Sequence, residues 1–261
     1  MVAKFSEEKE KEIIRLYLEE GMNQKEIGKL YNTYNTSIRR VLERNNVPKR
    51  DKAHDRRSVN KNPFEDLSSK EVQYWLGYLA ADGNVNDLSQ KNNRISLDTN
   101  LDPEHLEKYR SFLGINKKIY KFWNKSHELY EYSLAFSNRK VCEYLHEIGI
   151  TARKSKTLKV NFNLTKSFVL GYFDGNGFIS KKRLGVSTGS REFLTQLKEF
   201  FYSNYDRIPN VQEDSKSSCY TVYYSSIPFI ANIMVDLYNS SPVYLERKYN
   251  KFRSLYSSLI G

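Results

Sequence analysis

The sequence predicts an α+β protein made of two similar halves behind a small all-α unit. Two nonapeptides carry this prediction: WLGYLAADG, ending at Gly83, and VLGYFDGNG, ending at Gly177, 94 residues further on. Each closes an apolar run, and each is followed by alternating, strand-like segments and then by a helix-like one. Repetition of this order at domain spacing indicates a duplicated unit.

The sequence pattern of residues 1–48 predicts three short helices. Ser6 can cap a first helix whose opening turn is acidic, and Gly21 ends it. A second helix runs from about Asn23 to Leu30, and a third begins at Asn35. The short break between the last two favours a helix-turn-helix, with a small helical bundle that contacts other proteins as the alternative.

The third helix would then be the recognition helix, because polar side chains suited to base edges or phosphates stand at its start. Residues 49–66 form a basic linker, which could lie along a DNA groove or serve as a solvated tether. The DNA-binding candidates in this part are Asn35, Thr36, Ser37, Arg39 and Arg40 in the helix, and Lys49, Arg50, Arg56 and Arg57 in the linker.

The two halves, about residues 67–160 and 161–261, predict elements in one common order. Pro103 suits the first turn of a helix, Gly149 a helix end, and the alternation from residue 130 to 136 a half-buried strand. In the first half we expect helices at 68–81, 103–113 and 138–148, and strands near 84–88, 93–99, 117–124 and 128–136. In the second we expect helices at 166–175, 191–202 and 228–238, and strands near 178–183, 185–188, 211–213 and 219–225. Each half ends in a basic segment, at 151–159 and 244–252.

The nonapeptides predict a very close helix pair. Gly77 with Ala81, and Gly171 with Gly175, are four residues apart and clear one side of each helix. The helix ends would then bring the polar residue before each final glycine side by side: an acid in the first copy and an amide in the second.

Both strings resemble the LAGLIDADG motif of homing endonucleases, in the single-chain form that carries two repeats. The resemblance covers about residues 67–261. It implies two αββαββ halves related by a pseudo-two-fold axis, with strands that form a DNA-binding saddle. It also implies a monomeric, site-specific endonuclease that cuts double-stranded DNA at one long target and serves the mobility of an intron or intein.

Hydrolysis of a phosphodiester needs an activated water and a partner for developing negative charge, and a Mg²⁺ ion held by oxygen ligands supplies both. The resemblance implies that Asp82 and Asn176 hold the metal, helped by the carbonyls of the residues before them, Ala81 and Gly175. It further places Lys154 and Lys248 at the scissile phosphates, where ordinary phosphate anchoring is the alternative role.

Asn176 departs from the family pattern, which has an acid at this position. An amide keeps one oxygen ligand but loses the charge, and Asp174, two residues earlier, points to another side of the helix. Three interpretations stay open: an engineered substitution that traps bound DNA, a natural enzyme that nicks, and a descendant that does not cleave.

The predicted strands offer further DNA-binding candidates, since a β-ribbon can follow the major groove. In the first half these are Asn84, Asn86, Arg94, Ser96, Lys117, Lys121 and Trp123. In the second half they are Ser180, Lys182, Gln212, Tyr220 and Tyr224. Any of these positions could instead lie on a solvated outer face.

The composition indicates what kind of partner the protein binds. A net charge of +11 favours nucleic acid, and two cysteines in 261 residues give neither a disulfide framework nor a zinc site. With no signal peptide, membrane span or P-loop, we expect an intracellular, cytoplasmic protein that binds neither membranes nor small-molecule substrates. Besides the endonuclease, two functions remain: a non-catalytic DNA-binding regulator and an intron RNA maturase.

Overall fold

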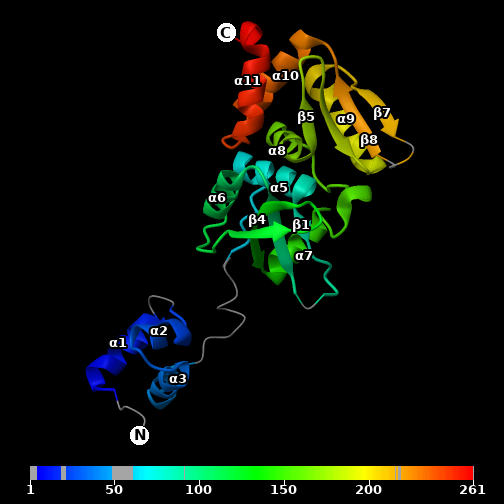
Figure 1. Cartoon of the computed structure of the whole chain (residues 1–261). Helices are drawn as coiled ribbons and strands as arrows, with labels where there is room; N and C mark the ends of the chain where they lie inside the picture. The colour runs from blue at the N-terminus through cyan, green and yellow to red at the C-terminus, as the bar shows by residue number, and fades with distance from the viewer. Residues whose placement is uncertain are drawn as a thin grey trace. The chain divides into compact units, whose positions relative to one another are not determined.

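The structure is a computed structural model of the chain, and it describes residues 5–18, 22–48, 61–90, 92–214, 216 and 219–260. Contacts divide the chain into two compact units, Met1–Asp55 and Arg56–Gly261 (Figure 1). Four linker residues predicted to bind DNA lie outside the described residues: Lys49, Arg50, Arg56 and Arg57.

The N-terminal unit is a bundle of three helices, α1 (Glu7–Leu18), α2 (Gln24–Leu30) and α3 (Asn35–Arg44). Asn23 begins α2 through a capping box: its side chain accepts from the Glu26 N–H, and the Glu26 carboxylate accepts from the Asn23 N–H. Apolar side chains at helical spacing close a small core, namely Ile13, Leu16, Tyr17, Ile27, Ile38, Val41 and Leu42. The three helices predicted from the sequence are present.

The C-terminal unit repeats one order of elements twice, which confirms the predicted fold class. The first half contains α5 (Lys70–Asp82), β1 (Asn84–Val85), β2 (Arg94–Thr99), α6 (Pro103–Phe112), β3 (Tyr120–Asn124), β4 (Leu129–Ser137) and α7 (Arg139–Glu147). The second contains α8 (Lys166–Asn176), β5 (Gly177–Ile179), β6 (Leu184–Thr188), α9 (Arg191–Tyr205), β7 (Asn210–Asp214), β8 (Cys219–Tyr224) and α10 (Ile227–Asn239). Each half forms one antiparallel sheet, in the orders β1-β2-β4-β3 and β5-β6-β8-β7.

Strand pairing gives each sheet a helix-covered face and an open face. In the first sheet, Leu97 pairs with Leu134 and both are buried, while Ser96, one residue earlier, pairs with Asn84 and Ala135 on the other side. In the second sheet, Val186 and Val222 face the core, and Ser187, Thr221 and Gln212 share the open face. Alternation along the strands therefore fixes which side chains a partner on the open face would meet.

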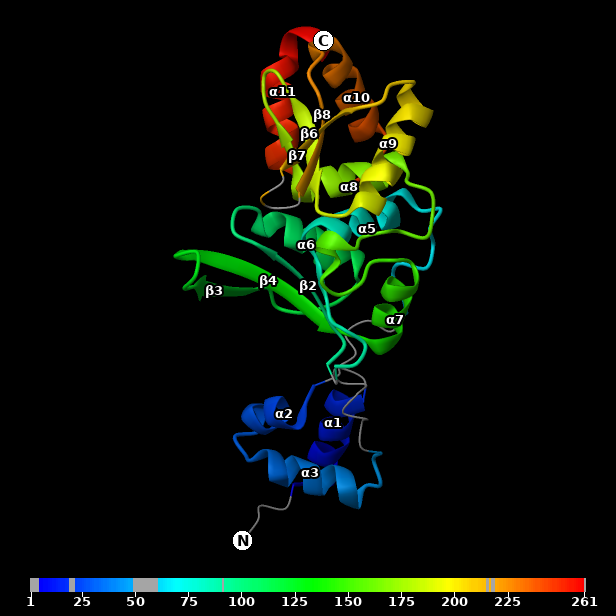
Figure 2. The same ribbon diagram turned by 90° about the vertical axis from the view of Figure 1, so that its right-hand side faces the viewer.

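The two halves meet along α5 and α8, which lie side by side between the sheets (Figure 2). A Cβ added to Gly77 would lie 2.0 Å from the Phe168 carbonyl oxygen, and one added to Gly171 would lie 2.0 Å from that of Tyr74. No side chain fits at either glycine, because the backbones themselves are in contact. The close helix pair predicted from the glycine spacing is present, and it places the two helix C-termini together.

Two strands are shorter than predicted, since the stretch 84–88 holds only β1 and the stretch 178–183 only the end of β5, and one helix was not predicted. Residues 244–252, expected as a basic segment, begin a helix instead, α11 (Glu246–Ile260). It buries Phe252 and Tyr256 in the core, a spacing of four residues that the many charges in this stretch obscured. The first half has only a short 3₁₀ turn, η1 (Lys154–Lys156), after its last helix. Like the other described helices, α11 is too short or too polar to cross a bilayer.

Candidate functional site

The paired helices end in the two motif residues singled out from the sequence. Asp82 is the last residue of α5 and Asn176 the last of α8, and both side chains reach solvent. A Cβ added to Gly175 would lie 2.3 Å from the Ala81 Cβ and 3.4 Å from Asp82 Oδ2. The glycine thus lets the two helix ends, and the Asp82 carboxylate, come together.

Two buried lysines cover these helix ends. Lys154, in η1, donates to the Gly83 carbonyl. Lys248, in the first turn of α11, donates to the carbonyls of Phe173 and Gly177, both at 2.6 Å. Ammonium groups are favoured here because the carbonyls at a helix C-terminus carry partial negative charge. Burial lowers the pKa of each lysine to about 8, so both remain mostly protonated at neutral pH.

Asp82 is open to solvent on one side and surrounded by protein on the other. The surrounding protein raises the pKa of this carboxyl above its ordinary value, because it replaces water around the charge. Lys248 opposes the rise most strongly and Lys154 less so. Both lysines thus act on the Asp82 charge, Lys248 more than Lys154, and we call Asp82 and Lys248 the acidic half-site.

Asn176 lies with the lysine of the first half. A cavity of about 530 Å³ is lined by Asn176, Lys154, Tyr172 and Ser187, among others. The Asn176 amide donates to the Tyr172 hydroxyl at 3.4 Å, and that hydroxyl donates to the Ser187 carbonyl at 3.0 Å. We call Asn176 and Lys154 the amide half-site. Each ammonium group bonds the helix end of its own half, Lys154 at the Gly83 carbonyl and Lys248 at the Gly177 carbonyl, so the half-sites are defined by charge and by the shared cavity.

The donor atoms at the helix ends are oxygens. Within the part of the chain that the structure describes, no three His, Cys, Asp or Glu side chains come together as a metal cluster. The helix ends carry the Asp82 carboxylate, the Asn176 amide oxygen and the Ala81 carbonyl, whereas the Gly175 carbonyl already accepts a hydrogen bond from Lys248 at 3.3 Å. A hard cation that keeps several of its waters, such as Mg²⁺, fits a set with so few charged ligands.

Comparison with known proteins decides the family. The LAGLIDADG-like domain family matches residues 69–157 and 163–245, one copy for each half. The chain belongs to the LAGLIDADG family.

The alignments with curated relatives cover about half of this LAGLIDADG chain. A replication factor C small subunit of Methanocaldococcus jannaschii is 25% identical over 138 residues, which is 49% of this chain and 7% of that protein. Its counterpart in Thermococcus kodakarensis is 23% identical over 129 residues, 47% of this chain and 14% of that protein. The chain therefore spans a small part of the length of these relatives.

A solved structure agrees with the LAGLIDADG fold. The meganuclease I-SmaMI, solved bound to uncleavable DNA, has a TM-score of 0.51 with 12% sequence identity, over 72% of this chain and 90% of that one. At this identity the likeness concerns the fold: two halves, each with its own sheet.

Asp174, the acid nearest to the LAGLIDADG residue Asn176, does not take the place of the missing carboxylate. It is 2% exposed, and it accepts hydrogen bonds from the Tyr74 hydroxyl and the Leu245 N–H, both at 2.8 Å. Burial raises the pKa of Asp174, and the two hydrogen bonds and Lys248 oppose the rise. The side chain points into the protein, as its position two residues before Asn176 predicts.

The DNA-binding candidates on the LAGLIDADG strands divide between the two faces. Register places Asn84, Arg94, Ser96 and Gln212 on the open faces, although neighbours bury the small Ser96. Two other pairs of candidates do not lie on the open faces. Lys121 and Trp123 are on the same side of their sheet as Leu134, exposed beyond the helices and packed around Tyr130. Tyr220 and Tyr224 are buried on the helix-covered face, which corrects their assignment as DNA-facing residues.

The remaining candidates lie in loops and in the N-terminal unit. The Asn86 amide donates to Gln90 and to the Asn92 carbonyl, and it closes the loop after β1. Lys117, Ser180 and Lys182 precede β3 or turn between β5 and β6. Asn35, Thr36, Ser37, Arg39 and Arg40 form the start of α3, where all but the partly buried Ser37 are exposed.

The open faces of this LAGLIDADG fold also hold residues that the sequence did not single out. Strand pairing gives Tyr120, Phe122, Ser187, Thr221 and Tyr223, with the Arg183 guanidinium 4.6 Å from the centre of the Tyr223 ring. The signal that could have found them is the pairing of neighbouring strands, because one known core residue on a strand assigns the face of every second position.

Proposed function

We propose that this LAGLIDADG protein is a site-specific endonuclease of double-stranded DNA that depends on Mg²⁺ and cuts one strand much faster than the other. The observation that carries the proposal is the acidic half-site: a carboxylate and a buried ammonium group where two paired helices end and the first strands of the two sheets begin. The similar fold reported above is that of a meganuclease bound to DNA, which makes duplex DNA the substrate to test.

The residues of the site have separate tasks in this proposal. Asp82, with the carbonyl of Ala81, holds the divalent cation. When bound, the cation supplies an activated water and neutralises charge on the phosphate. Lys248 and Lys154 stabilise the negative charge that develops on the phosphate oxygens, which requires protonated ammonium groups. A pKa of about 8 keeps both lysines charged at neutral pH.

The open faces form the DNA interface in this proposal. Arg94 and Arg183 supply positive charge for phosphates, and Asn84, Gln212 and Thr221 supply donors and acceptors for base edges. A β-sheet can lie along the major groove, and the net charge of +11 favours approach to the phosphate backbone. Because one chain carries both halves, we propose that it acts as a monomer.

The experiment uses a target selected from a randomised duplex library, by retention on the protein in EDTA, and cloned into a supercoiled plasmid. Adding Mg²⁺ is expected to convert supercoiled plasmid to the nicked circle, with the linear form appearing much later. End-labelling shows which strand is cut. Binding without any nicking in Mg²⁺ or Mn²⁺ contradicts the enzyme and leaves the second candidate.

That second candidate is a DNA-binding regulator that has lost cleavage, and one observation favours it. Asn176 leaves the amide half-site without a carboxylate, so a cation there has only neutral protein ligands. Retention of Asp82, Lys154 and Lys248 at the helix ends favours the enzyme instead.

We propose further that the N-terminal unit is a helix-turn-helix that extends the DNA footprint through α3. Deleting residues 1–60 is expected to shorten the footprint at one end. Affinity falls, and its dependence on salt becomes flatter, because fewer phosphate contacts release fewer counterions. Footprinting and binding at several salt concentrations measure both effects. Arg39 and Arg40, changed together to Ala in the full chain, should reproduce the loss at the same end, whereas an unchanged footprint and salt slope contradict this role.

A further inference from the structure

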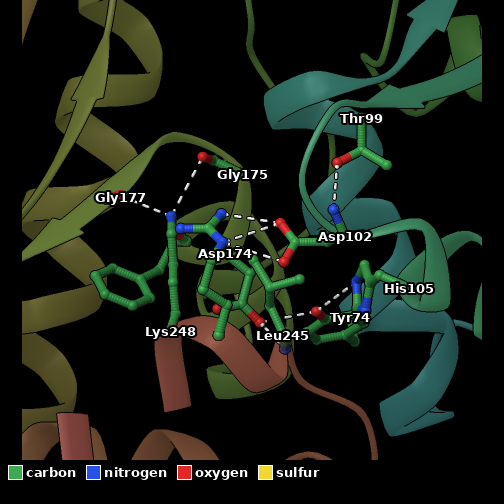
Figure 3. A network of polar contacts seen from close by, with 11 residues as sticks. Tyr74, Thr99, Asp102, His105, Asp174, Gly175, Gly177, Leu245 and Lys248 are labelled. Atoms are coloured by element: carbon green, nitrogen blue, oxygen red, sulfur yellow. Dashed lines mark hydrogen bonds and ion pairs between the residues drawn. The ribbon is translucent and has the colours of Figure 1, made fainter. Parts of the chain in front are cut away.

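We propose that Asp174 is a positioning residue that fixes Lys248 in the acidic half-site by anchoring the first turn of α11. The proposal rests on the endonuclease function above, because Lys248 is the group that would face the phosphate. It assigns a task to a buried carboxylate that neither the metal site nor the DNA interface uses (Figure 3).

The anchor is a chain of hydrogen bonds from the side chain of Asp174 to the backbone of Lys248. Asp174 Oδ2 accepts from the Leu245 N–H at 2.8 Å. The Leu245 carbonyl then accepts from the Lys248 N–H at 3.1 Å, one turn further on. A carboxylate at a helix N-terminus also meets unpaired N–H groups and the positive end of the helix dipole, so it stabilises the turn in this place.

The ammonium end of Lys248 returns to the segment that carries Asp174. Lys248 Nζ donates to the carbonyls of Phe173 and Gly177, and more weakly to that of Gly175 at 3.3 Å. The end of α8 therefore holds the lysine twice: by its backbone, through Asp174, and by its charged tip, through three carbonyls. Loss of the contact between Asp174 and the Leu245 N–H would free the first turn of α11, which carries the Lys248 side chain.

The first half of the protein fixes the same turn from the other side. The Tyr74 hydroxyl donates to Asp174 Oδ2 and also contacts His105 Nε2 at 3.0 Å. Arg247, next to Lys248, pairs with Asp102 at 2.9 Å, and Lys108 pairs with Glu246. The turn that carries Lys248 is thus tied to residues of both halves. Lys154, by contrast, sits on a single 3₁₀ turn, and the residue corresponding to Asp174 in the first motif is Ala80.

Stability alone does not account for Asp174. Its second oxygen, Oδ1, is buried without a hydrogen-bond partner among the described residues. A buried carboxylate that is only partly satisfied costs free energy, and an apolar residue would usually pack with less cost. A role in positioning Lys248 explains why residue 174 is an acid.

The experiment is a double-mutant cycle with Asp174→Ala and Lys248→Ala in the full chain, on the supercoiled plasmid with the selected target. Asp174→Ala is expected to slow nicking about 100-fold, the scale of a 1 Å misplacement of a reacting group. In the Lys248→Ala background the same change should alter the rate about twofold or less, because its effect passes through Lys248. Asp174→Asn keeps an oxygen for both hydrogen bonds and should restore the larger part of the rate.

A matched control separates positioning from a general loss of stability. Asp236→Ala removes a carboxylate of the same half that pairs with Lys166 and accepts from Tyr205, away from the helix ends. It should lower the melting temperature as Asp174→Ala does but leave the rate of the folded protein unchanged. Equal effects of Asp174→Ala in both Lys248 backgrounds, or equal rate losses in Asp236→Ala and Asp174→Ala, overturn the proposal.

A second readout needs no nuclease activity. Acetylation by an N-hydroxysuccinimide ester, followed by mass spectrometry, reports how accessible each lysine amine is. Asp174→Ala should increase the acetylation rate of Lys248 several-fold and leave that of Lys154 unchanged. If no variant cuts DNA but Lys248 responds in this way, the endonuclease proposal fails and the positioning stands. If Lys248 stays as protected as before, the positioning fails whatever the plasmid shows.

Discussion

Asp82→Asn is expected to slow plasmid cleavage by a factor on the order of 10²–10³ while leaving DNA affinity nearly unchanged. The substitution keeps the size and one oxygen of the side chain but removes the carboxylate that ends α5, and the other motif carboxylate, Asp174, is buried and bonded elsewhere. Without this negative charge the cation is held weakly, and Lys248 loses one of the acids, after Asp174, that favour its protonated form. Because Asp82 would contact metal and not bases, binding should persist.

Two measurements check this expectation: the nicking rate in Mg²⁺ and the dissociation constant in EDTA. Asp87→Asn is a matched control, since it makes the same change on an exposed acid of the first half that caps a turn at Ser89. It should cut at the original rate. An Asp82→Asn protein that also cuts at the original rate would show that the metal site lies elsewhere.

Asn176→Asp is expected to raise cleavage of the slow strand by a similar factor, about 10²–10³. A carboxylate at this position would give the amide half-site the charge that Asp82 gives the acidic one, beside Lys154 and at the edge of the 530 Å³ cavity. The cation would then be held in both half-sites, and the plasmid would become linear directly instead of accumulating as a nicked circle.

The assay follows nicked and linear plasmid over time, with Asn163→Asp as the control because that exposed amide precedes α8 outside the site. If the unchanged protein already linearises plasmid as fast as Asn176→Asp, then residue 176 is not a ligand and the two half-sites are not equivalent. If both proteins bind the target and neither cuts, the regulator replaces the endonuclease.

Most of the fold was predictable because its signals are local. A glycine followed four residues later by another small residue predicts a close helix pair, and Gly77 and Gly171 contact the opposite backbone as that spacing requires. Alternation predicts strands for the same reason. The helix α11 was missed because its aromatic positions, at Phe252 and Tyr256, stand among many charged residues.

Face assignment failed where the side chain itself is ambiguous. Tyr220 and Tyr224 suit a half-wet surface as well as a core, and their period of two gives the strand but not its orientation. Only pairing with β6, where Leu184 and Val186 face the core, assigns the tyrosines to the helix-covered side. Lys121 and Trp123 were ambiguous in the same way.

By itself, the sequence determined the duplicated architecture, the paired helices and the identity of the polar residues at their ends. Only the tertiary structure showed where the two lysines meet these ends: Lys154 donates to the Gly83 carbonyl and shares a cavity with Asn176, and Lys248 donates to the carbonyls of Phe173 and Gly177. It also decided that Asp174 reaches Leu245, 71 positions away. Sequence spacing describes geometry within one helix or strand, and here it also predicts that α5 and α8 pack closely. Which side chains then meet depends on how separate segments of the folded chain are placed, and the spacing along the sequence does not give that.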